Sequence, residues 1–131
     1  MTSYYAGEVR TPKAVLVIVH DDNVRVAITT AFEDEGYIAT MAENGEEGLD
    51  FLRRLADRPC LIVLDESMPV MNGQDFLAAK QSDDRLSEIP VALMSDQIHR
   101  LRPETRRAAA RVFKKPVETA ELLEFASAYC D

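Results

Sequence analysis

The sequence predicts an α/β protein with a five-stranded parallel sheet and helices on both of its faces. Five short apolar runs, typical of buried strands, alternate along the chain with segments whose apolar residues recur at helical spacing. In the central run, residues 61–65, four apolar residues precede an acidic one, as expected for a strand buried on both faces of a parallel sheet. Pro69 and the Asn72-Gly73 pair then turn the chain.

The expected elements follow in strict order. Strands are predicted at residues 14–19, 37–41, 61–65, 91–94 and 111–114. Helices are predicted after an Asn23 cap, after a capping box that begins at Asn44, and over residues 74–81, 103–109 and 119–129. Gly48 weakens its helix by about 1 kcal/mol relative to Ala, so we expect it to pack closely against the sheet. The last helix is expected to bury Leu122, Ala126 and Tyr129.

Length and composition limit the possible functions. The 131 residues suffice for one domain, expected over residues 13–131 after a flexible leader over residues 1–12. The net charge of −8 argues against a nucleic-acid surface, and no apolar run has the length of a membrane span. Cys60 and Cys130 lie far apart and fit no metal or redox spacing, so buried or idle thiols in a reducing cytoplasm are expected.

Polar residues follow the strands that should end at one edge of the sheet. They are Asp21, Asp22, Asp65, Ser95 and Lys115. Three neighbouring carboxylates repel one another, and an all-oxygen site of this kind suits Mg²⁺. A cation and Lys115 would together attract a phosphoryl group, which Asp65 could attack to form an aspartyl phosphate. Each residue could instead have a purely structural role, as a helix cap or a solvated lysine. One shared functional site explains five such residues at one edge of the sheet better than five separate structural roles do.

These residues resemble the signature of response-regulator receiver domains, the phosphoacceptor modules of two-component signalling. The resemblance covers residues 13–129 and rests on Asp21-Asp22, the run DESMPVMNG that begins at Asp65, Ser95, and Lys115-Pro116. It implies a flavodoxin-like, doubly wound sheet of order 2-1-3-4-5.

The resemblance also implies a mechanism and partners. Asp65 would accept a phosphoryl group from a histidine kinase or phosphotransfer protein, with Ser95 and Lys115 contacting the phosphate. Mg²⁺ would be held by Asp21, Asp22, Asp65 and the backbone carbonyl of Ser67. The domain would switch the binding of a downstream protein. It would act in the cytoplasm, without nucleic acid or membrane, and would not be an enzyme beyond its own phosphorylation and dephosphorylation.

Some positions depart from the family pattern. His20 occupies a place that is often acidic, which leaves open which two of His20, Asp21 and Asp22 form the acidic pair. Asp96 brings negative charge beside Ser95, and Val112 stands where a switch aromatic is expected. A pseudo-receiver that binds proteins without phosphorylation is therefore an alternative.

Two further questions stay open at this point. A phosphohydrolase with an Asp nucleophile is a weaker alternative, because Ser67 stands two places after Asp65, where haloacid-dehalogenase-like enzymes have Asp. The chain could also be a stand-alone receiver or a receiver from a larger regulator or hybrid kinase.

Overall fold

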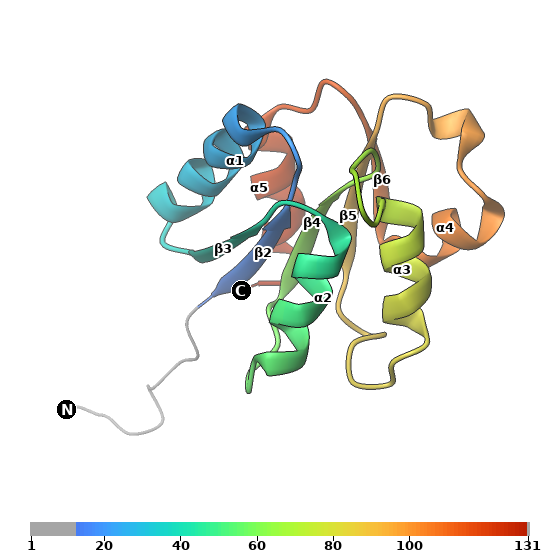
Figure 1. The fold of residues 1–131 in the computed structure, drawn as a ribbon. Helices are drawn as coiled ribbons and strands as arrows, with labels where there is room; N and C mark the ends of the chain where they lie inside the picture. Colours follow the sequence, from blue (N-terminus) through green and yellow to red (C-terminus); the bar gives the residue numbers. More distant parts are fainter. Residues whose placement is uncertain (1–12, 131) are drawn as a thin grey trace.

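A computed structural model describes residues 13–130 as one sheet with helices on both faces (Figure 1). The leader expected over residues 1–12 lies outside the described residues. Among the described residues, no helix is both long and apolar enough to cross a bilayer. The elements in chain order are β2 (Ala14–Ile18), α1 (Asp22–Asp34), β3 (Ile38–Ala42), α2 (Gly45–Arg54), β4 (Leu61–Asp65), α3 (Gly73–Gln81), β5 (Val91–Ser95), the 3₁₀ helix η2 (Ile98–Arg100), α4 (Pro103–Ala108), β6 (Arg111–Lys114) and α5 (Thr119–Ser127).

The sheet is parallel and has the order β3-β2-β4-β5-β6. In chain order this is 2-1-3-4-5, so the predicted fold class is confirmed. The chain leaves β2 toward one edge to form β3, then returns past β2 to form β4, β5 and β6. The switch point therefore falls between β2 and β4, and the loops that follow the strands gather at one end of the sheet (Figure 1).

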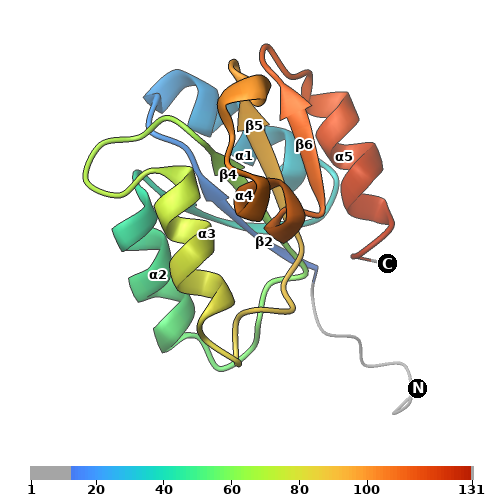
Figure 2. The same ribbon diagram turned by 90° about the vertical axis from the view of Figure 1, so that its right-hand side faces the viewer.

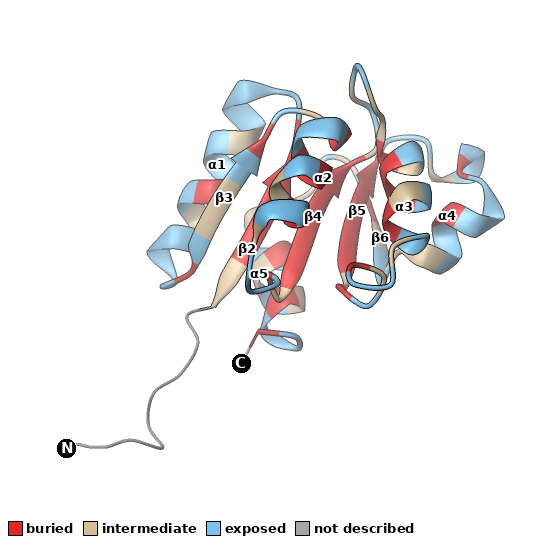
Figure 3. Cartoon of the chain, turned by 60° about the horizontal axis from the view of Figure 1, so that its bottom comes forward, coloured by how far each residue is buried: buried red, intermediate tan, exposed pale blue. Residues whose placement is uncertain are grey.

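Two apolar cores cover the two faces of the sheet. Side chains alternate along each strand, so Val17 and Val63 pack beneath α1 and α5, whereas Ile18 and Leu64 pack beneath α2 and α3. Figure 2 shows α4 and α5 flanking β6 on opposite sides. The buried residues of the central strands form a continuous layer under the exposed helix surfaces (Figure 3). A strand buried on both sides explains why β4 contains no polar residue before Asp65.

Gly48 brings α2 close to the sheet. A Cβ at this position would lie 2.5 Å from Cδ1 of Ile18 and 3.4 Å from Cε1 of Phe76. The prediction of close packing at Gly48 is confirmed, and the loss of helix propensity is offset by the apolar contact that the missing side chain permits.

The ends of two helices differ from the prediction, and the start of a third agrees with it. Asp21, not Asn23, caps α1, because Oδ1 of Asp21 accepts a hydrogen bond of 3.0 Å from the Val24 N–H and the helix starts before Asn23. Asn44 caps α2 as predicted. The prediction that Tyr129 is buried is wrong: α5 ends at Ser127, and Tyr129 is 44% exposed.

Cys60 and Cys130 form a disulfide, so the prediction of idle thiols is wrong. Their separation of 70 residues gave no sign of pairing, but the fold brings their Cα atoms to 5.3 Å from each other. Cys60 directly precedes β4, and Cys130 follows α5 on the same side of the sheet. A helix that runs antiparallel to the strands returns its carboxyl end to the amino ends of the strands. The disulfide and the acidic residues therefore lie at opposite ends of the sheet.

Candidate functional site

Asp65 is the last residue of β4 and is only 5% exposed. Gly73 at the start of α3 allows the chain to fold back tightly on it: a Cβ there would lie 2.7 Å from the Asp65 carbonyl oxygen and 2.8 Å from Cα of Glu66. The Gly73 N–H donates a hydrogen bond of 2.9 Å to the Glu66 carbonyl. The Asn72-Gly73 turn predicted from the sequence thus fixes the backbone beside the buried carboxylate.

Lys115 provides the positive charge that faces this carboxylate. Its N–H donates a hydrogen bond of 2.9 Å to the Ser95 carbonyl, which extends the pairing of β5 and β6 by one residue. Its Nζ forms an ion pair with Oδ1 of Asp65. The Lys115 side chain is 30% exposed and that of Asp65 8%. Because both side chains are largely shielded from water, the attraction between their charges is stronger than it would be in bulk water.

Ser95 ends β5 between these two residues and is fully buried. Its hydroxyl donates to Oε1 of Glu66 at 3.4 Å and accepts from the Gln97 N–H at 3.1 Å. The sequence prediction did not assign a role to Glu66, although it lies within the motif that begins at Asp65. In this arrangement Ser95 is engaged with Glu66 and Gln97 rather than with Asp65.

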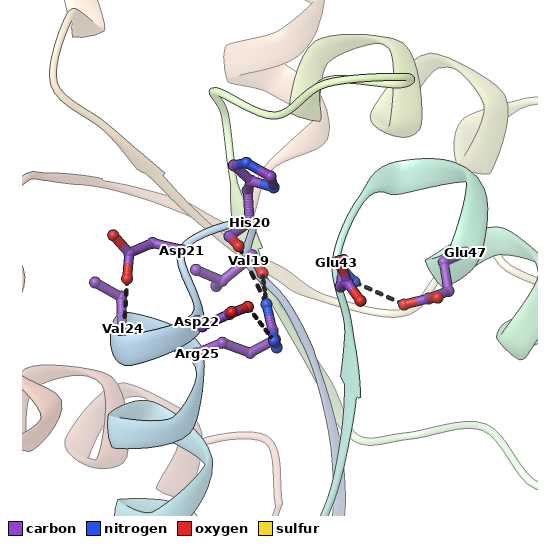
Figure 4. A network of polar contacts seen from close by, with 8 residues as sticks. All are labelled: Val19, His20, Asp21, Asp22, Val24, Arg25, Glu43 and Glu47. Carbon is purple, nitrogen blue, oxygen red and sulfur yellow. Dashed lines mark hydrogen bonds and ion pairs between the residues drawn. The ribbon is translucent and has the colours of Figure 1, made fainter.

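The loop between β2 and α1 places the two remaining acidic residues differently (Figure 4). Asp21 caps α1 and lines the same cavity as Asp65. The carboxylate of Asp22 instead accepts a hydrogen bond of 2.6 Å from Nη2 of Arg25. Figure 4 shows the His20 ring pointing away from this ion pair. The sequence analysis did not assign a role to Arg25. The available signal was its position three residues after Asp22, which allows the two side chains to meet on one face of a helix.

A cavity of about 490 Å³ adjoins Asp65. Its polar walls are formed by Asp21, Asp65, Asp96 and Lys115. Its apolar walls come from α1, β5 and the loop after β6, through Val24, Ile28, Met94, Pro116 and Val117. The structure therefore brings Asp21, Asp65 and Lys115 to one space, as the sequence predicted, while Asp22 and Ser95 do not line it.

The oxygen donors of this cavity fit Mg²⁺, but they include fewer of the carboxylates that the sequence predicted as its ligands. Within residues 13–130 there is no group of three or more His, Cys, Asp or Glu side chains able to hold a metal. Oδ2 of Asp21 and Oδ2 of Asp65 make no hydrogen bond to another described residue. The Ser67 N–H donates to Oδ1 of Asp65 at 3.3 Å, so the backbone of Ser67 lies next to this carboxylate. Two carboxylates completed by water and phosphate oxygens are a usual Mg²⁺ environment.

The fold and this edge define a doubly wound α/β domain with a buried aspartate at its switch point, and comparison with known proteins identifies the family. The sequence model described as "Response regulator receiver domain" matches residues 15–127. This chain therefore belongs to the family of response-regulator receiver domains, and it is a receiver domain of two-component response regulators.

Individual relatives agree with this assignment. An uncharacterized 14.6 kDa protein of Leptolyngbya boryana is 31% identical over 121 residues, 88% of each chain. Sporulation initiation phosphotransferase F of Bacillus subtilis is 24% identical over 88% of this chain and 91% of its own. The receiver domain of the sensor histidine kinase PA1611 of Pseudomonas aeruginosa, solved with a magnesium ion in its active-site cleft, is 17% identical. Its fold matches with a TM-score of 0.80 over 92% of this chain and 98% of its own.

Proposed function

We propose that this domain takes a phosphoryl group onto Asp65 from a histidine kinase or phosphotransfer protein, and that this changes its binding to a downstream protein. The observation that carries the proposal is the buried carboxylate of Asp65, paired with Lys115 and open to a cavity beside Asp21. Receiver domains in this family interact with such kinases and phosphotransfer proteins. Receiver domains are response regulators rather than classical enzymes.

The phosphoryl transfer requires little of the domain beyond positioning the reacting groups and compensating their charge. An oxygen of Asp65 forms the new bond to phosphorus while the phosphorus–nitrogen bond of the donor phosphohistidine breaks, and the imidazole leaves. Oδ2 of Asp65 makes no hydrogen bond to another described residue, which suits it to the attack. Lys115 already contacts Oδ1 and would compensate part of the negative charge that arrives with the phosphoryl group. Ser95 would supply a hydroxyl donor after leaving Glu66.

Mg²⁺ would supply further neutralisation of the phosphoryl oxygens when bound. Asp21 and Asp65 are the carboxylates in position to hold it, with the backbone carbonyl of Ser67 as a further ligand. Asp22 belongs to the ligand set that the family pattern implies, but its carboxylate forms an ion pair with Arg25. Magnesium-bound receiver domains are found among the structures of similar fold, which supports the choice of cation.

Location in the cytoplasm is part of the proposal and goes with its phosphoryl donor, a histidine kinase or phosphotransfer protein. The disulfide between Cys60 and Cys130 argues against this location, because such bonds are rare in reducing compartments. Trapping of thiols in intact cells would measure whether the bond is closed where the domain acts.

Phosphorylation of the purified domain tests the main proposal. The protein is incubated with a small phosphodonor and Mg²⁺, and its intact mass is followed. We expect the wild type and an Asp84→Asn control, which changes an exposed aspartate, to gain one phosphoryl group, and Asp65→Asn to gain none. Equal labelling of Asp65→Asn, or no labelling of the wild type, would overturn the proposal.

A binding-only pseudo-receiver is the second candidate. It is favoured by Asp96, whose carboxylate lines the cavity where a phosphoryl group would arrive and would repel it. In this case the domain would bind its downstream protein equally well with and without the phosphodonor. Asp96→Asn distinguishes the two functions, because it should speed labelling of a phosphoacceptor and leave a pseudo-receiver unlabelled.

A further inference from the structure

The guanidinium of Arg25 is fixed in the loop between β2 and α1. Its Nη1 donates to the backbone carbonyls of Val19 at 3.0 Å and His20 at 3.1 Å. Its Nη2 donates to Oδ1 of Asp22 at 2.6 Å (Figure 4). Both carbonyls belong to the segment that carries the chain from the end of β2 to Asp21. Arg25 is therefore held against the backbone that leads from β2 to α1.

The two side chains of this ion pair differ in how exposed they are and in how many contacts hold them. The Arg25 side chain is 12% exposed and that of Asp22 is 80% exposed. Burial and two carbonyl acceptors hold the guanidinium in place, whereas Asp22 is held by this single contact. Asp22 is thus the partner that moves if the pair opens.

The short loop explains why an arginine of α1 can reach this position. The helix begins at Asp22, only a few residues after β2 ends at Ile18. Arg25 lies in the first turn, and its own N–H donates to the Asp21 carbonyl at 2.8 Å. Its side chain consequently points back over the end of β2 rather than out along the helix. A longer loop would place this side chain farther from the carbonyls of Val19 and His20.

We propose that Arg25 is a positioning residue that withholds Asp22 from the cation site and thereby lowers the affinity of the domain for Mg²⁺. The inference rests on the proposed function, because it concerns the same acidic edge. The guanidinium acts as a built-in cation: it satisfies one carboxylate that would otherwise be available to the metal, and its own charge opposes the approach of a second cation. Asp21 and Asp65 then remain as the two metal-binding carboxylates.

Calorimetric titration with MgCl₂ tests the inference without any phosphodonor. Asp22→Asn should leave the dissociation constant within about threefold of wild type, because its carboxylate is already withheld. Asp21→Asn, in which the asparagine still caps α1, should weaken binding by more than about tenfold.

The ion pair itself is tested by a double-mutant cycle. Arg25→Met keeps much of the apolar stem and should tighten Mg²⁺ binding by about tenfold, equivalent to about 1.4 kcal/mol. Adding Asp22→Asn to Arg25→Met should abolish most of that gain, because the released carboxylate is no longer there. If Arg25→Met does not fold, Asp22→Asn and Asp21→Asn decide the matter, since both keep the guanidinium on its two carbonyls.

Three results would overturn the inference. One is a loss of affinity in Asp22→Asn as large as in Asp21→Asn, which would make Asp22 a ligand in the folded protein. Another is a folded Arg25→Met variant that binds Mg²⁺ no more tightly than the wild type. The third is no binding of Mg²⁺ to either the wild type or Arg25→Met. Labelling of wild-type Asp65 by a phosphodonor is measured separately, so the proposed function can stand or fall independently of the role of Arg25.

Discussion

Lys115 and Asp65 form an ion pair across the end of β5, although they follow or end strands that are not neighbours in the sheet. Ser95, the last residue of β5, lies buried between these two strand ends. A phosphoryl group on Asp65 would therefore meet Lys115 first and would compete with Glu66 for the Ser95 hydroxyl. We therefore expect phosphorylation to alter the segment that follows Ser95.

We predict that a phosphate mimic changes hydrogen exchange mainly in residues 95–110. The segment consists of η2 and the six-residue helix α4, which share few contacts with the sheet. Gln74 of α3 holds it, since its Oε1 accepts hydrogen bonds from the Arg102 N–H at 3.0 Å and the Thr105 hydroxyl at 2.8 Å. Gln74→Ala should raise exchange in this segment even without the mimic. Changes confined to residues 122–129 would contradict this expectation.

The switch position in β6 supports the same expectation. Val112 packs with the core beneath α2 and α3, whereas Phe113 lies on the opposite face against the ring of Phe125. The two side chains face opposite sides because neighbouring residues of a strand alternate. Neither side chain can therefore act as a polar-tipped aromatic that fills the space left by Ser95.

We predict a slow loss of the acyl phosphate. Ser67 and Gln97 are exposed near the expected path of an attacking water, and neither is a good general base. Ser67→Asp places a carboxylate there and should shorten the lifetime. The phosphoryl group is followed by intact mass after the phosphodonor is removed. A wild-type lifetime of only seconds, or one unchanged in Ser67→Asp, would count against this explanation.

Reduction of the disulfide should destabilise the fold. The bond between Cys60 and Cys130 closes a 70-residue separation, for which the chain-entropy estimate is about 4 kcal/mol. A dithiol reductant should therefore lower the melting temperature by on the order of 10 °C. The control is a Cys60→Ala/Cys130→Ala variant, which should melt at the lower temperature with or without the reductant. An unchanged wild-type melting temperature would show that the bond adds no stability.

Lys80 should make stability depend on pH in the alkaline range. Its side chain is fully buried and donates to the Ser87 carbonyl at 2.9 Å, and burial lowers its pKa from 10.5 to about 8 despite the opposing charge of Glu88. Below pH 8 both the folded and the unfolded states hold the proton, and the buried charge is a constant cost. As the pH rises from 8 toward 10.5, only the unfolded state keeps the proton, so folding stability rises.

A Lys80→Met variant isolates this contribution. The free energy of unfolding of the wild type relative to the variant should increase on going from about pH 7 to about pH 10, by on the order of 3 kcal/mol. Urea titrations of both proteins at the two pH values measure it. A difference that stays constant would mean that Lys80 is charged to the same extent in the folded and unfolded states, and one that falls as the pH rises would mean that folding raises its pKa.

The sequence predicted most of the fold because local and long-range signals agreed. Each buried strand is a continuous apolar run, and right-handed crossovers leave few ways to order such strands. The errors fall where a contact joins distant segments or where a helix end shifts. Cys60 and Cys130 meet only because α5 runs back along the sheet, which residue spacing does not reveal.

The sequence predicted which residues lie at this edge of the sheet, but it did not predict how their side chains are oriented. The sequence placed Asp21, Asp22, Asp65, Ser95 and Lys115 at one edge, since parallel strands end together. It could not show that Asp22 turns toward Arg25 or that Ser95 contacts Glu66. Those contacts depend on the length of a loop and on side-chain directions, which only the folded chain determines.

Locating the phosphoryl group by peptide mass spectrometry tests the central claim most directly. The domain is treated with a small phosphodonor and Mg²⁺, digested at low pH, and the peptides are fragmented. We expect a single phosphoryl group on Asp65, released by hydroxylamine as expected for an acyl phosphate. A phosphoryl group on another residue, or an unlabelled Asp65 under conditions that label an established receiver domain, would contradict it.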